Sequence, residues 1–168
     1  YFRMLAINTL HRTFGRRLNN MTSELNIPTN ILTQIHADGE RSYPEEGAGL
    51  MLGKDENGRR EVQAILPLTN SREDSARHNR YLITAEDMMA GEMEAMRMGL
   101  DIVGIFHSHP DHPNRPSEFD REWALPWFSY VITSIQQGKA AGSRSWRLED
   151  NRQSFIEETI VVLETEQK

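Results

Sequence analysis

The chain of 168 residues contains no cysteine. This absence excludes disulfides, iron–sulfur clusters, thiolate zinc sites and a cysteine nucleophile. Any chemistry must therefore use the oxygen and nitrogen groups of serine, histidine, aspartate or glutamate, with or without a metal ion. The sequence also lacks a run of the roughly 18 apolar residues that a membrane-spanning helix needs. We therefore expect a cytoplasmic protein that has no membrane partner.

The sequence has no excess of basic residues either, because 25 acidic residues outnumber 19 lysines and arginines and give a net charge of -6. Nucleic-acid-binding domains are usually basic, so we expect no nucleic-acid partner. Residues 1–20 differ, since they hold four arginines and no acidic residue. The chain opens on Tyr1, and Met21 would make a natural initiator. We expect 1–20 to be a basic extension, poorly ordered or not native, and 21–168 to form a single domain.

The first half of the chain alternates between helical and strand patterns. The spacing of Ile31, Leu32 and Ile35 predicts a helix over 28–41. Strands over 49–53 and 61–68 flank an Asn-Gly turn, which predicts an antiparallel hairpin. A polar loop over 70–80 and a short strand over 81–83 are expected to follow.

A helix is predicted to begin after Thr84, which has Asp87 three residues later as an N-terminal capping signal, and to end at Gly99. Its methionines predict a packing face against the core. That face is composed of Met88, Met89, Met93, Met96 and Leu100.

The second half mixes strands with one short helix. A buried strand is predicted over 101–106 and a short helix over 117–124. The remaining expected elements are strands over 129–135, 145–148 and 154–164, with a turn over 136–143. Mixed strands and helices with at least one antiparallel hairpin indicate an α/β (α+β) fold around a mixed sheet.

The stretch HSHPDHPNRPSEFD carries the chemistry. His107 and His109 are two residues apart at a strand end, so both imidazoles project from one face. Asp120 follows Ser117 by three residues, which brings the two side chains together on the first turn of a helix. Two histidines and one aspartate leave a fourth position open for water, which is typical of a catalytic zinc site. Zinc lowers the pKa of such a water to about 7, so hydroxide becomes available near neutral pH.

A zinc hydrolase also needs a base and a group that stabilises the oxyanion. Ser117 lies beside the proposed ligand and offers a hydroxyl donor. Glu46, at the mouth of the predicted strand over 49–53, is our candidate base, and Glu45 is its competitor. Neighbouring residues on an extended segment point in opposite directions, so only one of the two should face the metal.

Each of these features also has a plain structural explanation. The histidine pair fits surface polar residues, Ser117 with Asp120 fits an ordinary helix cap, and Glu45 and Glu46 fit solvated loop charges. Their joint spacing, however, has a chance probability on the order of 10⁻⁴ in a chain of this length, given usual residue frequencies. The combination therefore favours a metal site.

These residues resemble the motif of the JAMM (MPN-plus) metalloproteases. That motif is an upstream Glu, then His-Ser/Thr-His-Pro, then Ser and Asp at fixed spacing, and the upstream Glu-x-x-Gly-Leu-x-x-Gly segment favours Glu46 over Glu45. The matching positions are Glu46, His107-Ser108-His109-Pro110, Ser117 and Asp120. The resemblance covers roughly 27–163. It implies the MPN/JAB fold, a curved mixed β-sheet flanked by helices and related to cytidine deaminases.

The resemblance also implies a function. One Zn²⁺ would be held by His107, His109 and Asp120, with Glu46 as general acid/base and Ser117 stabilising the tetrahedral intermediate. The reaction would hydrolyse an amide or isopeptide bond after the C-terminal glycine of a ubiquitin-like protein. Without long insertions or a cysteine/histidine zinc site, the chain resembles the compact prokaryotic members. Their association with ThiS/MoaD-type sulfur carriers makes a carrier ending in Gly-Gly the expected partner.

Two other functions stay open. One is a non-catalytic MPN scaffold or binding module, although such members usually lack the metal ligands. The other is a zinc amidohydrolase that acts on a small-molecule or cell-wall peptide amide, because the motif fixes the chemistry and not the substrate. Near the site in sequence, His112 is interpreted as a loop histidine. Arg77, His78 and Asn79 are interpreted as a solvated loop, with contact to a substrate tail as the alternative.

Overall fold

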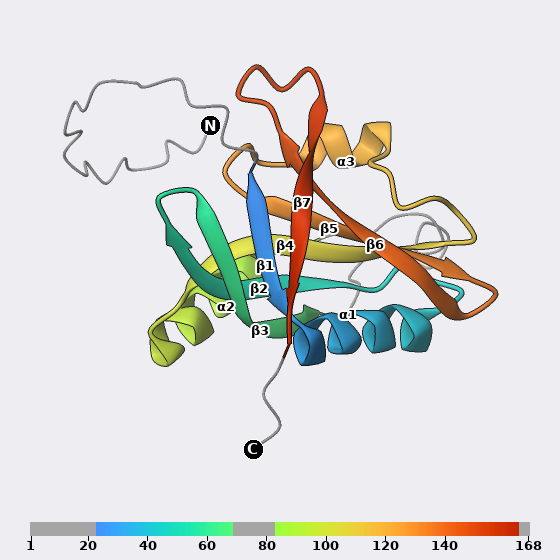
Figure 1. The fold of residues 1–168 in the computed structure, drawn as a ribbon, viewed down its shortest axis with the longest axis horizontal. Coiled ribbons are helices and arrows are strands. Elements are labelled where there is room, and N and C mark those ends of the chain that lie inside the picture. Colours follow the sequence, from blue (N-terminus) through green and yellow to red (C-terminus); the bar gives the residue numbers. More distant parts are fainter. Residues whose placement is uncertain (1–22, 69–82, 165–168) are drawn as a thin grey trace.

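The structure is a computed structural model that describes residues 23–68 and 83–164 (Figure 1). Within these two ranges, no helix is both long enough and apolar enough to cross a membrane. The predicted extension over 1–20, the predicted loop over 70–80 and most of the predicted strand over 81–83 lie outside the described residues. Ile83 is described and belongs to no strand.

The strands of the described residues form a closed barrel in the order β1-β3-β2-β4-β5-β6-β7 (Figure 1). Three neighbouring pairs are parallel, β1–β3, β1–β7 and β4–β5, and the others are antiparallel. This confirms the predicted mixed, curved sheet, and the curvature continues until β7 meets β1. The strands are β1 (Glu24–Pro28), β2 (Ala48–Glu56), β3 (Arg59–Leu68), β4 (Asp101–Pro110), β5 (Ser129–Gln136), β6 (Lys139–Leu148) and β7 (Phe155–Leu163).

In the part of the chain that the structure describes, three helices flank the barrel, as predicted: α1 (Thr29–Ser42), α2 (Ala85–Met98) and α3 (Glu118–Trp123). In Figure 1, α1 runs along the bottom of the barrel, α2 lies at the lower left and α3 lies at the upper right. The capping signal before α2 is confirmed, since Thr84 and Asp87 form a reciprocal capping box. Gly99 ends the helix in the left-handed conformation.

Two tight turns fix the register of two antiparallel pairs, β2–β3 and β5–β6. Asn57 and Gly58 both have positive φ and join β2 to β3, which confirms the predicted hairpin. Gln137 and Gly138 do the same between β5 and β6. The turn predicted over 136–143 is therefore wrong in length: two residues suffice, and β6 begins already at Lys139.

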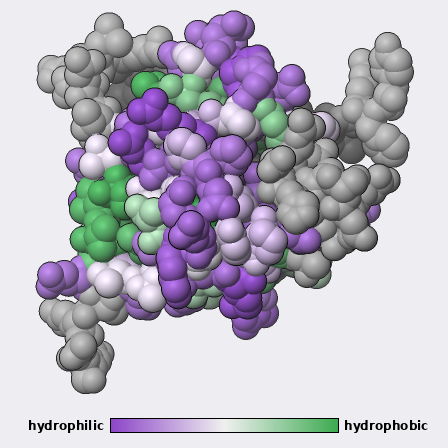
Figure 2. Space-filling view, turned by 90° about the vertical axis from the view of Figure 1, so that its right-hand side faces the viewer, coloured by the Kyte–Doolittle hydropathy of each residue, from purple (hydrophilic) through white to green (hydrophobic). Residues whose placement is uncertain are grey.

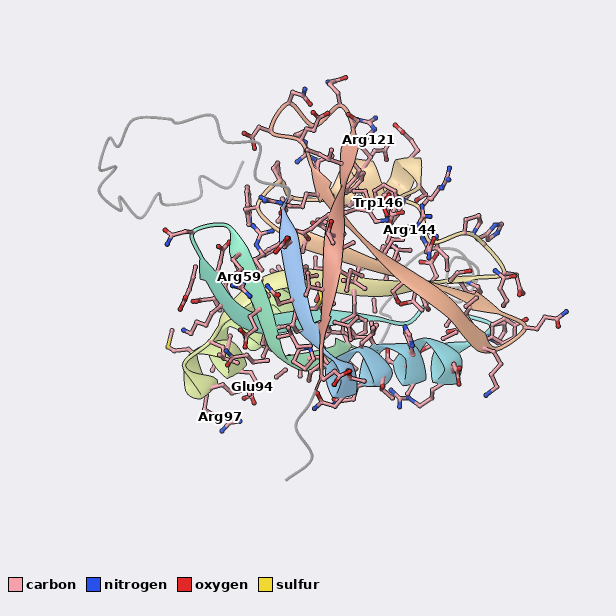
Figure 3. The ribbon with its side chains drawn as sticks, in the orientation of Figure 1. Arg59, Glu94, Arg97, Arg121, Arg144 and Trp146 are labelled. Atoms are coloured by element: carbon pink, nitrogen blue, oxygen red, sulfur yellow. The ribbon has the colours of Figure 1, made fainter. Side chains whose placement is uncertain are left out.

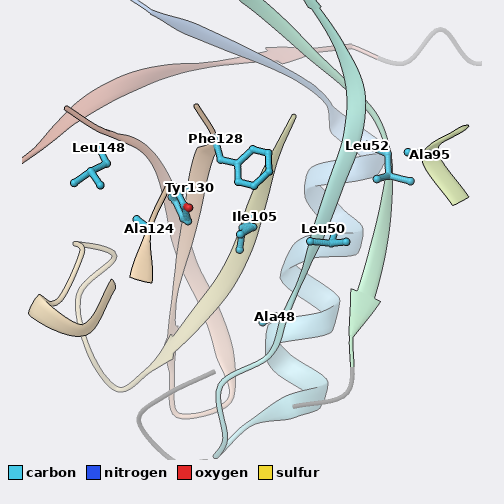
Figure 4. Close-up of a cluster of buried hydrophobic side chains, with 9 residues drawn as sticks. All are labelled: Ala48, Leu50, Leu52, Ala95, Ile105, Ala124, Phe128, Tyr130 and Leu148. Carbon is cyan, nitrogen blue, oxygen red and sulfur yellow. The ribbon is translucent and has the colours of Figure 1, made fainter. Parts of the chain in front are cut away.

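The central strands are buried on both faces because each face packs a separate core. One core joins α1 to the barrel through residues such as Ile35, Met51 and Phe106. The other lies between the sheet and α2 and α3, and Figure 4 shows it around Leu50, Ile105 and Tyr130. This two-sided burial explains the continuous apolar runs of β2, β4 and β5.

The surface away from these cores is mostly polar. Figure 2 shows the right-hand side of the molecule, where hydrophilic residues predominate and hydrophobic residues gather at the left of the view.

The predicted methionine packing face of α2 is wrong. Met89, Met93 and Met96 are 59%, 67% and 79% exposed, whereas Met88 and Leu100 are partly buried as expected. The helix instead buries its small residues Gly91 and Ala95. A Cβ on Gly91 would lie 2.1 Å from Leu50 Cδ1, so this glycine leaves room for the buried Leu50 side chain of β2. The exposed methionines lie on the parts of the helix that do not face this core.

The β2–β3 pair makes a similar demand at Gly53, beside a register shift in the ladder. A Cβ there would lie 1.9 Å from the carbonyl oxygen of Glu61 on β3. Because that atom belongs to the backbone, we expect Gly53→Ala to lower the free energy of unfolding by about 1–3 kcal/mol. Urea denaturation measures this, with Lys54→Ala as a control expected to cost less than about 1 kcal/mol. Equal midpoints for the two variants would contradict the packing described.

Candidate metal centre

The two histidines lie near the C-terminal end of β4, between β2 and β5. His107 pairs with Ala48 of β2 on one side and with Ile132 of β5 on the other. His107 and His109 are 1% and 8% exposed, and their Nε2 atoms lie 3.1 Å apart. The alternation of a strand therefore brings both imidazoles to one face, as the spacing predicts.

Asp120 reaches the same point from α3. Its Oδ1 lies 3.2 Å from His107 Nε2, and its Oδ2 lies 3.7 Å from His109 Nε2. Ser117 and Asp120 form a capping box at the start of this helix. The Ser117 N–H and hydroxyl both donate to Asp120 Oδ2 at 2.6 Å, and the Asp120 N–H donates to Ser117 Oγ at 3.2 Å. The cap holds the carboxylate toward the histidines.

Glu46 lies just before β2, next to the histidine strand. The neighbouring Gly47 N–H donates to Ser108 Oγ at 2.9 Å, and the Ser108 N–H donates to the Gly47 carbonyl at 2.9 Å. These two bonds fix the Glu46 segment against β4. Glu46 is 6% exposed and lines a cavity beside His109, whereas Glu45 is half-buried and does not line it. Only one of the two candidate bases therefore faces the cluster.

A backbone carbonyl orients His109. Its Nδ1 lies 2.8 Å from the carbonyl oxygen of Pro113, which accepts a hydrogen bond when Nδ1 carries the proton. That tautomer leaves the Nε2 lone pair, on the side of Asp120 and His107, available to a metal ion. Metal-binding histidines commonly use their second nitrogen in this way.

The three groups influence each other's protonation. Burial lowers the pKa of His107, which favours the neutral imidazole that a metal requires. Burial also opposes the charge on His109, but its bonds to Asp120 and to the Pro113 carbonyl outweigh this and raise its pKa. Burial likewise opposes the Asp120 carboxylate, yet the two histidines and Ser117 hold the pKa of Asp120 well below its usual range. An anionic carboxylate thus lies beside a neutral imidazole.

The donor set fits a divalent metal. One ligand atom from each of His107, His109 and Asp120 lies within 4.8 Å of the other two, and all three residues are buried. Two imidazole nitrogens and one carboxylate oxygen form the three-ligand set of a catalytic zinc site. The geometry needed to converge on an ion is therefore present in the side chains themselves.

A cavity of about 530 Å³ opens beside this cluster. Its lining includes Glu46, His109 and Ser117, which the sequence analysis predicts as site residues. It also contains His112, which was interpreted as a plain loop histidine, and Arg115 and Phe119, which sequence reasoning missed. Their position after the His-Pro pair is the signal that could have found them. Arg77, His78 and Asn79 lie outside the described residues.

Comparisons with known proteins place the chain in a family. Residues 28–149 match the family model described as prokaryotic homologs of the JAB domain. A Thermus thermophilus protein named as a probable TtuB-protein conjugate cleaving protease is 32% identical over 115 residues, which span 67% of this chain and 73% of that protein.

Two solved structures are similar. A Salinibacter ruber protein is 41% identical, with a TM-score of 0.66 and coverage of 85% of this chain and 94% of the other. A Desulfitobacterium hafniense protein has a TM-score of 0.74 at 24% identity, covering 84% and 94%, and supports the fold alone. The family match spans most of the barrel. It includes both the Glu46 segment and the segment that contains His107, His109 and Asp120, as the JAMM resemblance predicts. The chain therefore belongs to the prokaryotic JAB-domain family.

Proposed function

We propose that this protein is a zinc-dependent peptidase or isopeptidase. Its substrate is the amide bond that follows the C-terminal Gly-Gly of a ubiquitin-like or sulfur-carrier (ThiS/MoaD-like) protein. The observation that carries the proposal is the buried His107–His109–Asp120 cluster, which borders a cavity shared with Glu46 and Ser117. The name of the Thermus thermophilus relative, a conjugate-cleaving protease, supports the substrate class.

In this proposal, His107, His109 and Asp120 hold the ion. Zinc, when bound, acts as a Lewis acid toward the scissile carbonyl and makes water acidic near neutral pH. Glu46 accepts a proton from the attacking water and returns it to the leaving amine, so that one amide and one water give a carboxylic acid and an amine. Its burial beside His109 shields this transfer from bulk solvent.

Ser117 is proposed to donate a hydrogen bond to the developing oxyanion. Its hydroxyl donates to Asp120 Oδ2 in this structure, so donation to a substrate requires the proton to turn from Asp120 toward the cavity. Rotation about the C–O bond suffices, because Oγ can keep accepting the Asp120 N–H that caps α3. Capping and oxyanion stabilisation are therefore compatible in one side chain.

The direct test is cleavage of a ThiS/MoaD-type carrier whose Gly-Gly end is extended by a short peptide. We expect the zinc-loaded protein to release the extension after the second glycine, as seen by mass spectrometry, and a chelator to stop the release. No cleavage of the carrier by a zinc-loaded protein would support the scaffold alternative. Cleavage of small peptide amides but not of the carrier would support the small-amide alternative.

Replacing Ser117 with alanine tests the oxyanion role. We expect the rate to fall by about 10²–10³-fold, the usual loss for an oxyanion donor. The lost cap should also lower the free energy of unfolding by about 1 kcal/mol. Ser117→Thr keeps the hydroxyl and should retain both properties. A full rate in Ser117→Ala, with only the stability reduced, would leave Ser117 as a helix cap and nothing more.

A further inference from the structure

Arg115 is a cavity residue to which the proposed reaction gives no role. Arg115 is exposed and lines the same cavity as Glu46, His109 and Ser117. Within the described residues, its side chain has no ion pair or hydrogen bond, and its one bond runs from its backbone N–H to the Pro113 carbonyl. Nearby arginines differ, since Arg121 pairs with Glu118 and Arg144 pairs with Glu157.

The loop that carries Arg115 is held firmly from both sides. Asp111 accepts from the Tyr43 hydroxyl at 2.9 Å and from the Gln137 N–H at 2.8 Å, and its own N–H donates to Ile135. Asn114 lies one residue before Arg115, and its side chain donates to the Gly142 carbonyl at 3.1 Å.

The Asn114 carbonyl is held as well, because it accepts from the indole N–H of Trp146 at 3.1 Å. Figure 3 labels Trp146 beside α3. The loop backbone is thus fixed while the guanidinium is left unpaired. This arrangement suits a group that binds a ligand, because little backbone order remains to be lost on binding.

The charges of the cavity define which ligand fits. Its acidic lining residues in the described part of the chain are Glu46 and Glu118, and Glu118 is already neutralised by Arg121. Arg115 is the one lysine or arginine that lines this cavity among the described residues. A guanidinium binds carboxylates in a bidentate manner, with two parallel hydrogen bonds. The complementary ligand is therefore a carboxylate located near the reacting bond.

We propose that Arg115 binds the C-terminal carboxylate of a short leaving group, a single amino acid or a small peptide attached to the carrier's last glycine. This rests on the proposed function. Glu46 delivers its proton to the leaving amine, and in a one-residue leaving group the carboxylate carbon lies only about 2.5 Å from that amine, given standard backbone geometry. The cavity contains both Glu46 and Arg115, so it can receive the two ends of such a group.

The test compares three carriers: one ending in Gly-Gly-Ala with a free carboxylate, the same chain ending in a carboxamide, and Gly-Gly-Asp carboxamide. We expect Arg115→Gln to raise KM for the free carboxylate by about 10- to 100-fold with little change in kcat, because a charge-assisted hydrogen bond is lost. The alanine carboxamide should be unaffected, and Arg115→Lys should recover part of the loss. Arg59→Gln is the matched control, because Arg59 is an exposed arginine on the β2–β3 hairpin, well apart from α3 (Figure 3).

Binding to the zinc-loaded Glu46→Gln variant, measured by calorimetry, gives a second readout that needs no turnover. We expect it to bind the free carboxylate about 10- to 100-fold more tightly than the carboxamide, and Glu46→Gln/Arg115→Gln to lose that preference. Equal binding of both carriers, or no binding, would overturn the inference. An Arg115 effect confined to the aspartate carboxamide would also overturn it, since the carboxylate would then be a side chain. If the wild type cleaves no carrier, the proposed function fails while the binding preference still decides the role of Arg115.

Discussion

Replacing Glu46 with glutamine is expected to lower kcat by about 10²–10⁴-fold or to abolish measurable turnover, while zinc stays bound. Glutamine has nearly the same shape, so the buried segment before β2 should keep its bonds to Ser108. What is lost is the ability to take and return a proton. Steady-state kinetics on the extended carrier, together with metal analysis of the same sample, measures both quantities.

The neighbouring acid is the matched control. Glu45→Gln removes the same charge one residue away, from a side chain that does not line the cavity. We expect this variant to keep wild-type kinetics within about threefold, since surface substitutions outside such features have small effects. An active, zinc-loaded Glu46→Gln protein would exclude Glu46 as the base. A collapse of activity in Glu45→Gln alone would transfer the role to its neighbour.

Removal of the proposed carboxylate ligand is the second large effect. We expect Asp120→Ala to lose its zinc and to reduce carrier cleavage to background, because only two of the three ligands remain. The variant also loses half of the capping box on α3, which costs about 1 kcal/mol. Atomic absorption after dialysis, with circular dichroism as a check on folding, measures the outcome.

Two further variants separate the metal from the helix. Asp120→Asn retains an oxygen that can accept the Ser117 N–H, so it should fold like the wild type and still bind zinc poorly. Glu122→Ala removes an exposed acid from the same helix and should change neither property. Full zinc occupancy in Asp120→Asn, together with full activity, would show that the carboxylate is not a ligand.

Local signals predicted much of the fold because they act within a few residues. Asn57-Gly58 is favourable at positive φ, so the β2–β3 hairpin could be read directly. The Thr84 and Ser117 capping signals each need only a side chain and the backbone three residues later.

The failures come from pairings between distant parts of the chain. Strand β1 was not predicted, because five residues ending in proline carry little pattern of their own, and they pair with β3 and β7 far away in sequence. The glycine and small residues at the start of β6 indicate a turn until β5 pairs with them. On α2, the methionines obscured the fact that Gly91 leaves room for Leu50 of β2.

The candidate site shows the same difference between local signals and contacts between distant segments. His107, His109, Ser117 and Asp120 come from one segment whose spacing predicts their convergence, and the structure brings them together. Glu46 comes from a distant segment; its place before a strand made it a candidate beside Glu45, and the family resemblance favoured it over that neighbour. Arg115 lies in the loop after β4, which is pinned to β5 and β6, and Phe119 follows on α3; their position after the His-Pro pair is the one local signal that places them near the cavity. The catalytic and ligand roles themselves stay predictions.

The most direct test of a catalytic metal centre is a zinc titration of the metal-free protein, followed by cleavage of the extended carrier. The cluster of His107, His109 and Asp120 offers one site, so activity should rise linearly and level off at one zinc per chain. The Asp120→Ala protein should show no rise over the same range. Full cleavage before any metal is added, or an equal response from the Asp120→Ala protein, would contradict the account.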